Sequence, residues 1–437
     1  MCKNNVRWKI SAFLWCCISL NFLDRAILAA TAPYIKEEYN LTNAEMGIVL
    51  SAFFWTYALF QIPQGWFADK FGQRISLALS VGWWSFATIA TGLVASGFKS
   101  FLLFRAILGV GQAGGYTGCT GVVAKWFPIK ERARATAIYD SGSTVGTAVA
   151  MTVIVAMSVQ WGWRVPFIVF GILGFLWCAG WWIQYNDPEK HKTVSREELK
   201  YIQEGLLREG DDGEASTMKW YELLKYRNVW AMCLGFFTMN YAIYFFLTWF
   251  PTYLVEERGY AMMEMGWAAA VPPLSGLAGS IIGGVLMDKL YSKGYSLTFV
   301  RKLNLVGGML IGTCIIWSAL VESALLSLAL MSISYIGLLM ASCAVWSLVS
   351  DIAPVGKASV LCGLQNTFSN AGGVLGPLVT GFIVTATGSF VLALVISGIG
   401  IFIGAMIYLF VLGEVKPLQI KSSDSFPSKP IPNLSNR

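Results

Sequence analysis

The chain has 437 residues, of which 56% are hydrophobic and only 13% are charged, and its mean hydropathy is +0.58. A soluble protein of this size carries about a quarter charged residues, so this composition excludes an ordinary cytoplasmic enzyme. The net charge of +7 is spread over an apolar background, which also excludes a disordered or nucleic-acid-binding chain. The sequence therefore predicts an integral membrane protein.

A membrane-spanning helix needs roughly 20 mostly apolar residues. Twelve such runs occur, six on either side of one long polar stretch, near residues 10–34, 45–67, 75–96, 100–124, 135–158, 165–185, 228–254, 262–287, 303–321, 324–349, 358–386 and 388–412. We expect an all-α membrane protein with a six-helix bundle at 1–185 and a second one at 228–412. A cytoplasmic linker with an amphipathic helix would occupy 186–227, and a cytoplasmic tail would occupy 413–437.

The basic residues predict the orientation of the chain. When the loops are assigned to alternating sides, 26 of the Lys and Arg residues fall on one side and four on the other. Basic residues concentrate in cytoplasmic loops. We therefore expect a multi-pass protein of the cell (inner) membrane with both termini in the cytoplasm.

The two halves repeat each other. The run GWFADKFGQR at 65–74 ends the second apolar segment, and GVLMDK at 284–289 ends the eighth, at the same place in its half. Parallel repeats around a site near the middle of the membrane are an arrangement of alternating-access transporters.

Four motifs resemble those of the major facilitator superfamily. They are the run at 65–74, LLFRAILGVGQA at 102–113, NDPEK at 186–190 and GGVLGP at 372–377. The resemblance covers the whole chain in the right order. It implies two six-helix bundles that rock about a central site.

Four further stretches resemble the anion:cation symporter branch of that superfamily. They are LDRA at 23–26, SAFFWTY at 51–57, FLTWFP at 246–251 and SDIAP at 350–354. This branch includes bacterial permeases for galactonate, hexuronates and glucarate. The resemblance implies a sugar-acid permease.

Three charged residues lie deep in the apolar runs, namely Asp24, Arg25 and Arg105. An ionised group at this depth is costly unless it is paired. Arginine stays protonated and binds a carboxylate through two parallel hydrogen bonds. We expect Asp24 and Arg105 to meet in one outward-central cavity, and Arg25 and Arg105 to bind an organic anion there. The alternative is a permanent structural pair of Asp24 with one arginine.

Asp24 is the only acidic residue deep in a predicted helix, and it is the candidate proton-coupling group. Burial favours its neutral form and a neighbouring arginine favours the carboxylate, so the balance changes as a cavity opens. Many related permeases carry a glutamate seven residues after the arginine of the fourth helix, where this chain has Gln112. Glutamine cannot titrate, so we expect one protonatable site instead of two.

Further polar and aromatic residues are candidates for the binding site, because a hydroxyl-rich ligand needs several convergent donors and acceptors. The resemblance assigns this role to Tyr57, Trp346 and Asn366, and Gln112, Asn240 and Ser143 complete the predicted set. Each of them could instead be a packing residue. The motif loops predict conformational roles for Gly65, Asp69, Arg74 and Asp288.

The combined interpretation is a secondary active transporter that imports an organic anion, foremost a sugar acid (aldonate, hexuronate or aldarate), by proton symport. The alternatives are a proton-independent facilitator or exchanger of another carboxylate or a sulfonate, and a membrane sensor that moves nothing. No nucleotide-binding loop, metal cluster or catalytic triad occurs in the sequence. We expect no enzyme activity, no cofactor or metal, and a monomer with protons, the anion and lipid as its partners.

Overall fold

The computed structural model describes residues 6–206, 220–354 and 358–418; the side chains of some residues inside helices, Asp69 among them, are not described. The first half contains six long helices: α1 (Val6–Tyr39), α2 (Asn43–Phe71), α3 (Gln73–Val94), α4 (Phe98–Trp126), α5 (Ile129–Trp161) and α6 (Arg164–Gln184). Each agrees with one of the first six predicted runs. A short helix, α7 (Arg196–Leu206), follows in the polar stretch.

The second half also forms six helical segments, three of which are broken near their ends. Its helices are α8 (Arg227–Thr248), α9 (Phe250–Glu256), α10 (Met262–Ala268), α11 (Val271–Ser292), α12 (Leu297–Gly312), α13 (Cys314–Leu320), α14 (Ala324–Ile352), α15 (Ala358–Thr387) and α16 (Val391–Met406), which continues as a π-helix to Val411. Pro251 lies in the first turn of α9, and Pro272 and Pro273 lie at the start of α11. Proline is tolerated in the first turn of a helix but not in its interior, which accounts for two of the breaks.

The twelve segments confirm the predicted all-α membrane fold. Ten stretches within the described residues are long and apolar enough to cross a membrane. Helices α2 and α4 are not among these ten, although each has 29 residues. Both carry polar side chains along their length, such as Gln61 and Gln64 on α2 and Arg105 and Gln112 on α4.

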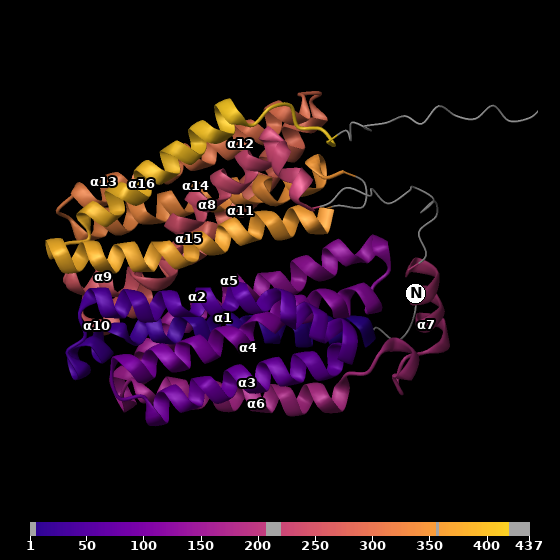
Figure 1. Ribbon diagram of the computed structural model, residues 1–437, viewed down its shortest axis with the longest axis horizontal. Coiled ribbons are helices and arrows are strands. Elements are labelled where there is room, and N and C mark those ends of the chain that lie inside the picture. The colour runs from indigo at the N-terminus through magenta and orange to yellow at the C-terminus, as the bar shows by residue number, and fades with distance from the viewer. Residues whose placement is uncertain (1–5, 207–219, 355–357, 419–437) are drawn as a thin grey trace, which may run out of the picture.

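The two halves lie side by side with their helices along the long axis of the molecule (Figure 1). Helices α1–α6 pack among themselves, and so do α8 and α11–α16. The halves meet through α2 against α15, α5 against α10 and α11, and α1 against α9. We call the end at which α1 begins and the linker connects the halves the linker end, and the opposite end the far end.

The far end holds the hydrogen bonds between the halves that involve described residues. Lys36 on α1 pairs with Glu256 on α9. The Ala44 amide on α2 donates to the Thr385 hydroxyl of α15 at 2.7 Å, and the Thr152 hydroxyl donates to the Gly266 carbonyl at 3.3 Å. The structure is therefore closed at the far end.

Glycines allow α2 and α15 to approach closely there. A Cβ atom on Gly47 would lie 2.8 Å from the Pro377 carbonyl oxygen and 3.2 Å from the Gly381 Cα atom. Small residues of this kind let helix backbones pack against each other in a membrane. The closed far end therefore depends on the absence of side chains at this crossing.

The linker helix α7 is docked on the first half. The Ser195 hydroxyl accepts a hydrogen bond from the Glu198 amide at 3.1 Å and caps the helix. The fully buried Glu198 carboxylate accepts hydrogen bonds from the Val6 and Arg7 amides and from the Arg7 guanidinium at 3.0 Å. Arg7 also pairs with Glu131 on α5 at 2.9 Å.

Candidate functional site

Arg25 on α1 lies in a cage of aromatic rings. Its guanidinium carbon is 4.7 Å from the ring centroid of Phe22, 4.8 Å from that of Phe53 and 4.7 Å from that of Tyr57. Its Nε donates to the Oε1 atom of Gln112 at 2.8 Å, and its Nη2 is buried without a hydrogen-bond partner. Cation–π contacts and one neutral amide therefore hold the guanidinium in place.

Arg105 on α4 lies beside Arg25. Its Nη2 donates to the backbone carbonyl of Arg25 at 3.2 Å, and its guanidinium carbon is 5.1 Å from the Phe53 ring centroid. The side chain is buried, and its Nε has no hydrogen-bond partner. Across the described part of the chain, no carboxylate lies within 4.0 Å of either guanidinium. Two neighbouring positive charges thus lack an ion-pair partner.

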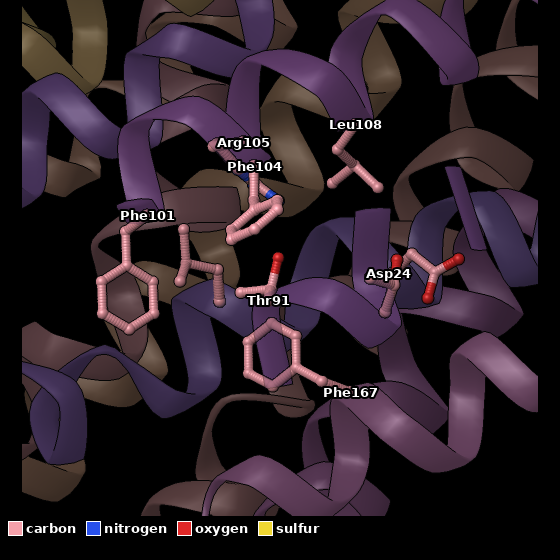
Figure 2. A pocket seen from close by; sticks show the side chains of 9 residues that line it. Asp24, Thr91, Phe101, Phe104, Arg105, Leu108 and Phe167 are labelled. Atoms are coloured by element: carbon pink, nitrogen blue, oxygen red, sulfur yellow. The ribbon is translucent and has the colours of Figure 1, made fainter. Parts of the chain in front are cut away.

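Asp24 faces a different part of the molecule from Arg25. It is 2% exposed, and neither carboxylate oxygen has a hydrogen-bond partner. Together with Arg105, Thr88 and Thr91 it lines a cavity of about 10 Å³ among α1, α3, α4 and α6, at the site shown in Figure 2. The Asp24–arginine ion pair weighed as an alternative is not formed in the described structure.

The position of this small cavity corrects one sequence expectation. Asp24 and Arg105 share a cavity, as expected, but its described lining residues all belong to the first half and do not include Arg25. Consecutive residues of an α-helix point about 100° apart, so Asp24 and Arg25 extend from different sides of α1. Arg25, the candidate for anion binding, and Asp24, the candidate for proton binding, therefore lie in separate cavities. Arg105 lines the cavity that contains Asp24.

A larger cavity of about 210 Å³ lies between the two halves. Arg25 is the one charged side chain among its described lining residues. The first half contributes Phe22, Arg25, Ser143, Thr144 and Thr147, and the second half contributes Asn240, Ile243, Tyr244, Leu247, Pro273, Gly276, Leu277, Ser280, Tyr335 and Leu339. We call it the central cavity.

The central cavity continues to the second arginine. A smaller space of about 20 Å³ is lined by both Arg25 and Arg105, and it shares Phe22, Thr147 and Leu247 with the central cavity. The two arginines that the sequence singles out are therefore brought together at the interface between the halves.

The other predicted binding residues divide into two groups. Ser143 and Asn240 line the central cavity, while Tyr57 and Gln112 contact Arg25 directly. Trp346 and Asn366 do not line either cavity between the halves. Trp346 is 48% exposed with its ring against Phe236, and Asn366 Nδ2 lies 3.8 Å from the Cys362 sulfur one turn away.

Among the predicted conformational residues, those whose side chains are described form no hydrogen bond or ion pair between the halves. Arg74 donates to the Asn186 side chain and the Trp182 carbonyl, both in its own half. Asp288 is exposed, and a Cβ atom on Gly65 would meet no atom within 4 Å. The side chain of Asp69 lies outside the described part. The linker end carries these motifs, whereas the contacts between the halves are at the far end.

Sequence reasoning missed five polar lining residues of the central cavity. They are Thr144, Thr147, Tyr244, Ser280 and Tyr335. Two of them had a usable signal: Tyr244 lies one helical turn after Asn240, and Thr147 lies one turn after Ser143, so each shares a face with a predicted residue. Ser280 and Tyr335 are ordinary residues of apolar helices, and only the packing of α11 and α14 brings them to the cavity.

Comparisons with known proteins agree with this fold. A family model described as Major Facilitator Superfamily matches residues 14–377. The chain belongs to the Major Facilitator Superfamily, a family of transporters and not of enzymes. Among solved structures, it resembles a bacterial homologue of the human lysosomal transporter Spinster in an inward-facing, unoccupied conformation. The TM-score is 0.78 at 22% identity, covering 94% of this chain and 98% of the other.

The names of similar proteins agree with the sugar-acid permeases that the sequence motifs resemble. A probable galactarate/D-glucarate transporter of Bacillus subtilis is 35% identical, over 98% of this chain and 97% of the relative. A D-galactonate transporter of Escherichia coli is 36% identical, over 94% of this chain and 96% of the relative. The chain is thus similar along nearly its whole length to proteins named as sugar-acid transporters.

Proposed function

We propose that this protein is a secondary active transporter that imports an organic anion of the sugar-acid class by proton symport and alternating access. The observation that carries the proposal is the pair of arginines at the interface of the halves. Arg25 and Arg105 place two positive charges beside one cavity without an ion-pair partner among the described residues. An anion that enters the cavity compensates a charge that is otherwise costly to bury.

The aromatic cage supports a role in binding a carboxylate. The rings of Phe22, Phe53 and Tyr57 surround the guanidinium of Arg25, and Gln112 occupies its Nε. The Nη2 nitrogen keeps its donors for a ligand. Arginine presents its donors in a plane that matches a carboxylate, and the hydroxyls and amide of the cavity suit a polyol chain.

Asp24 is our candidate for the proton site. A carboxyl group buried without hydrogen-bond partners favours the protonated form, whereas the charge of Arg105, which lines the same small cavity, favours the carboxylate. An anion that neutralises Arg105 would remove part of this support for the carboxylate. Anion binding and proton binding at Asp24 would then reinforce each other, as symport requires.

The distribution of basic residues supports an orientation with the linker end in the cytoplasm, and the inner membrane as the location. In this orientation the far end faces outward, and the contacts of Lys36 with Glu256 and of Gly47 with α15 close the outer side. Import requires these contacts to separate and contacts at the linker end to form in their place. The contacts at the linker end would involve the motif residues near that end, namely Asp69, Arg74 and Asp288.

One observation favours a second candidate, a proton-independent facilitator or exchanger. Gln112 contacts Arg25 at the place where many relatives of this branch carry an acid. Since glutamine cannot titrate, the described residues that contact Arg25 or line the central cavity include no acidic side chain, and coupling would depend on Asp24 alone.

The two candidates are separated by uptake of labelled sugar acids into proteoliposomes, with and without an inward proton gradient, for the wild type and Asp24→Asn. Symport predicts accumulation driven by the gradient, which the variant loses while it retains exchange. Equal uptake by both proteins without a response to the gradient would establish the facilitator or exchanger. Failure of the wild type to move any sugar acid would contradict the substrate class.

A further inference from the structure

The two walls of the central cavity differ in charge. The wall from the first half carries Arg25, with Arg105 directly behind it. The wall from the second half is made by α8, α11 and α14, and its described lining residues include no charged side chain. Its polar groups are the amide of Asn240 and the hydroxyls of Tyr244, Ser280 and Tyr335. The remaining surface is apolar.

We infer that the cavity selects a monocarboxylate with a neutral polyhydroxyl tail over a dicarboxylate of the same carbon chain. The single carboxylate would lie at the two arginines, and the hydroxyl end of the tail would lie against the wall from the second half. This inference rests on the proposed function and narrows its substrate class to aldonates and other sugar monoacids. Aldarates carry a second carboxylate at carbon 6 of the sugar acid, and the inference excludes them as preferred substrates.

The amide of Asn240 favours a hydroxyl over a carboxylate. The side chain is buried, and its Nδ2 donates to the Phe236 carbonyl at 3.2 Å. The amide oxygen makes no hydrogen bond to the described residues and therefore presents an acceptor. A hydroxyl can donate to it, whereas an ionised carboxylate is an acceptor only. The cavity thus offers a partner that the second carboxylate of an aldarate cannot use.

A second carboxylate would also have no cation to pair with. Taking an ionised carboxylate out of water costs several kcal/mol unless a good partner replaces the water. Both arginines belong to the first half and line the small space that adjoins the central cavity, where they can share one carboxylate through several parallel donors. Once the halves close around the ligand, the neutral wall would leave the second charge unpaired.

The test compares acids that differ only at carbon 6. Uptake of labelled D-galactonate and D-gluconate into proteoliposomes is competed with unlabelled D-galactonate, D-gluconate, galactarate and D-glucarate at neutral pH. We expect each aldonate to compete at a concentration at least about tenfold lower than the aldarate of the same stereochemistry, which corresponds to about 1.4 kcal/mol. An aldarate that competes equally well or better would overturn the inference while leaving the proposed function intact. If none of the four acids is bound or moved, the proposed function fails, and the inference fails with it.

A matched pair of variants then tests whether the neutral wall is the cause. Ser280→Lys places a cation on this wall, and Ser280→Met adds a side chain of similar length without charge. We expect the preference to move at least about tenfold toward aldarates in the lysine variant relative to the methionine variant. An identical preference in the two variants would contradict the assignment of selectivity to this wall.

Discussion

The two halves share a topology but differ in their chemistry. The first half carries Asp24, Arg25 and Arg105 within its helices, buried or surrounded by aromatic rings. In the second half, Arg301 pairs with Asp351 at 2.8 Å near the linker end, and Arg258 donates to Tyr253 and to carbonyls at the far end. Its cavity-lining residues are neutral. In the proposed transporter, the first half would therefore recognise the charge of the ligand and the second half its shape.

This division has a mechanical consequence. If the charged groups all move with one half, the ligand stays attached to that half while the other half rocks over it. The second half then contributes selectivity and closure without having to release a strong ion pair in each cycle. The following predictions test how far this division holds.

The largest effect is expected from Arg105→Lys. Lysine keeps the charge but loses the planar fork that donates to the Arg25 carbonyl and that, in the proposed function, binds the anion. We expect the initial rate of anion uptake at low substrate concentration to fall at least about 100-fold. Arg164→Lys is the control, since Arg164 forms a half-exposed ion pair with Glu38 at the far end. Comparable losses in both variants would show that Arg105 has no special role.

The next effect concerns the linker and its attachment to the first half. In Glu198→Gln, an NH₂ group replaces one of the carboxylate oxygens that accept hydrogen bonds from Val6 and Arg7. This NH₂ group is a donor and cannot accept them, and the ion pair with Arg7 is lost. Breaking a buried pair of this kind costs about 3 kcal/mol, so we expect hydrogen exchange in residues 196–206 to accelerate about 100-fold. Glu204→Gln, on the same helix with an exposed partner at 3.7 Å, should leave the exchange unchanged. Unaltered protection in Glu198→Gln would mean that α7 is held by other contacts.

A smaller effect is expected from Gly47→Leu, which inserts a side chain where α2 meets α15. The new Cβ would lie 2.8 Å from the Pro377 carbonyl oxygen, so the halves cannot approach as closely at the far end. We expect uptake to fall about tenfold, with longer distances between spin labels at the far ends of α2 and α15. Gly307→Leu is the control, because a Cβ there meets no atom within 4 Å. Normal closure in Gly47→Leu would refute the proposed role of this crossing.

The smallest effect is expected from Lys36→Met. The pair of Lys36 with Glu256 joins the halves, but Glu256 is one-third exposed. Ion pairs near the surface contribute about 0–1 kcal/mol, so the population closed at the far end should fall by no more than about fivefold. Spin-label distance distributions measure this population. A complete loss of the closed state would show that this pair, and not helix packing, holds the far end together.

Much of the fold could be predicted from the sequence. Each of the twelve predicted apolar runs corresponds to a helical segment, and the predicted linker helix is present as α7. The breaks at α8–α9 and α10–α11 were not predicted, although Pro251 and the Pro272–Pro273 pair mark them. A count of apolar residues does not register these prolines, because a broken helix has the same composition as a continuous one.

The charged residues of the site could be predicted from the sequence, whereas the directions in which the side chains point could be predicted only in part. The depth of Arg25 and Arg105 along their helices is sufficient to bring them to one level, and the structure places them side by side. The separation of Asp24 from Arg25 follows from helical geometry, and the sequence alone already contained it. Trp346 is exposed and Ser280 lines the central cavity because of how α14 and α11 are rotated about their axes. The sequence does not specify this rotation, because both helices are apolar on all sides.

Equilibrium binding tests the central claim most directly. Isothermal titration of the purified protein with D-galactonate and D-gluconate would compare the wild type, Arg25→Gln and Asp24→Asn. We predict a Kd at least about 100-fold higher for Arg25→Gln, whereas Asp24→Asn keeps measurable binding because Asp24 lies outside the central cavity. Unchanged affinity in Arg25→Gln would contradict the account, since it would show that the unpaired arginines of the first half do not hold the anion.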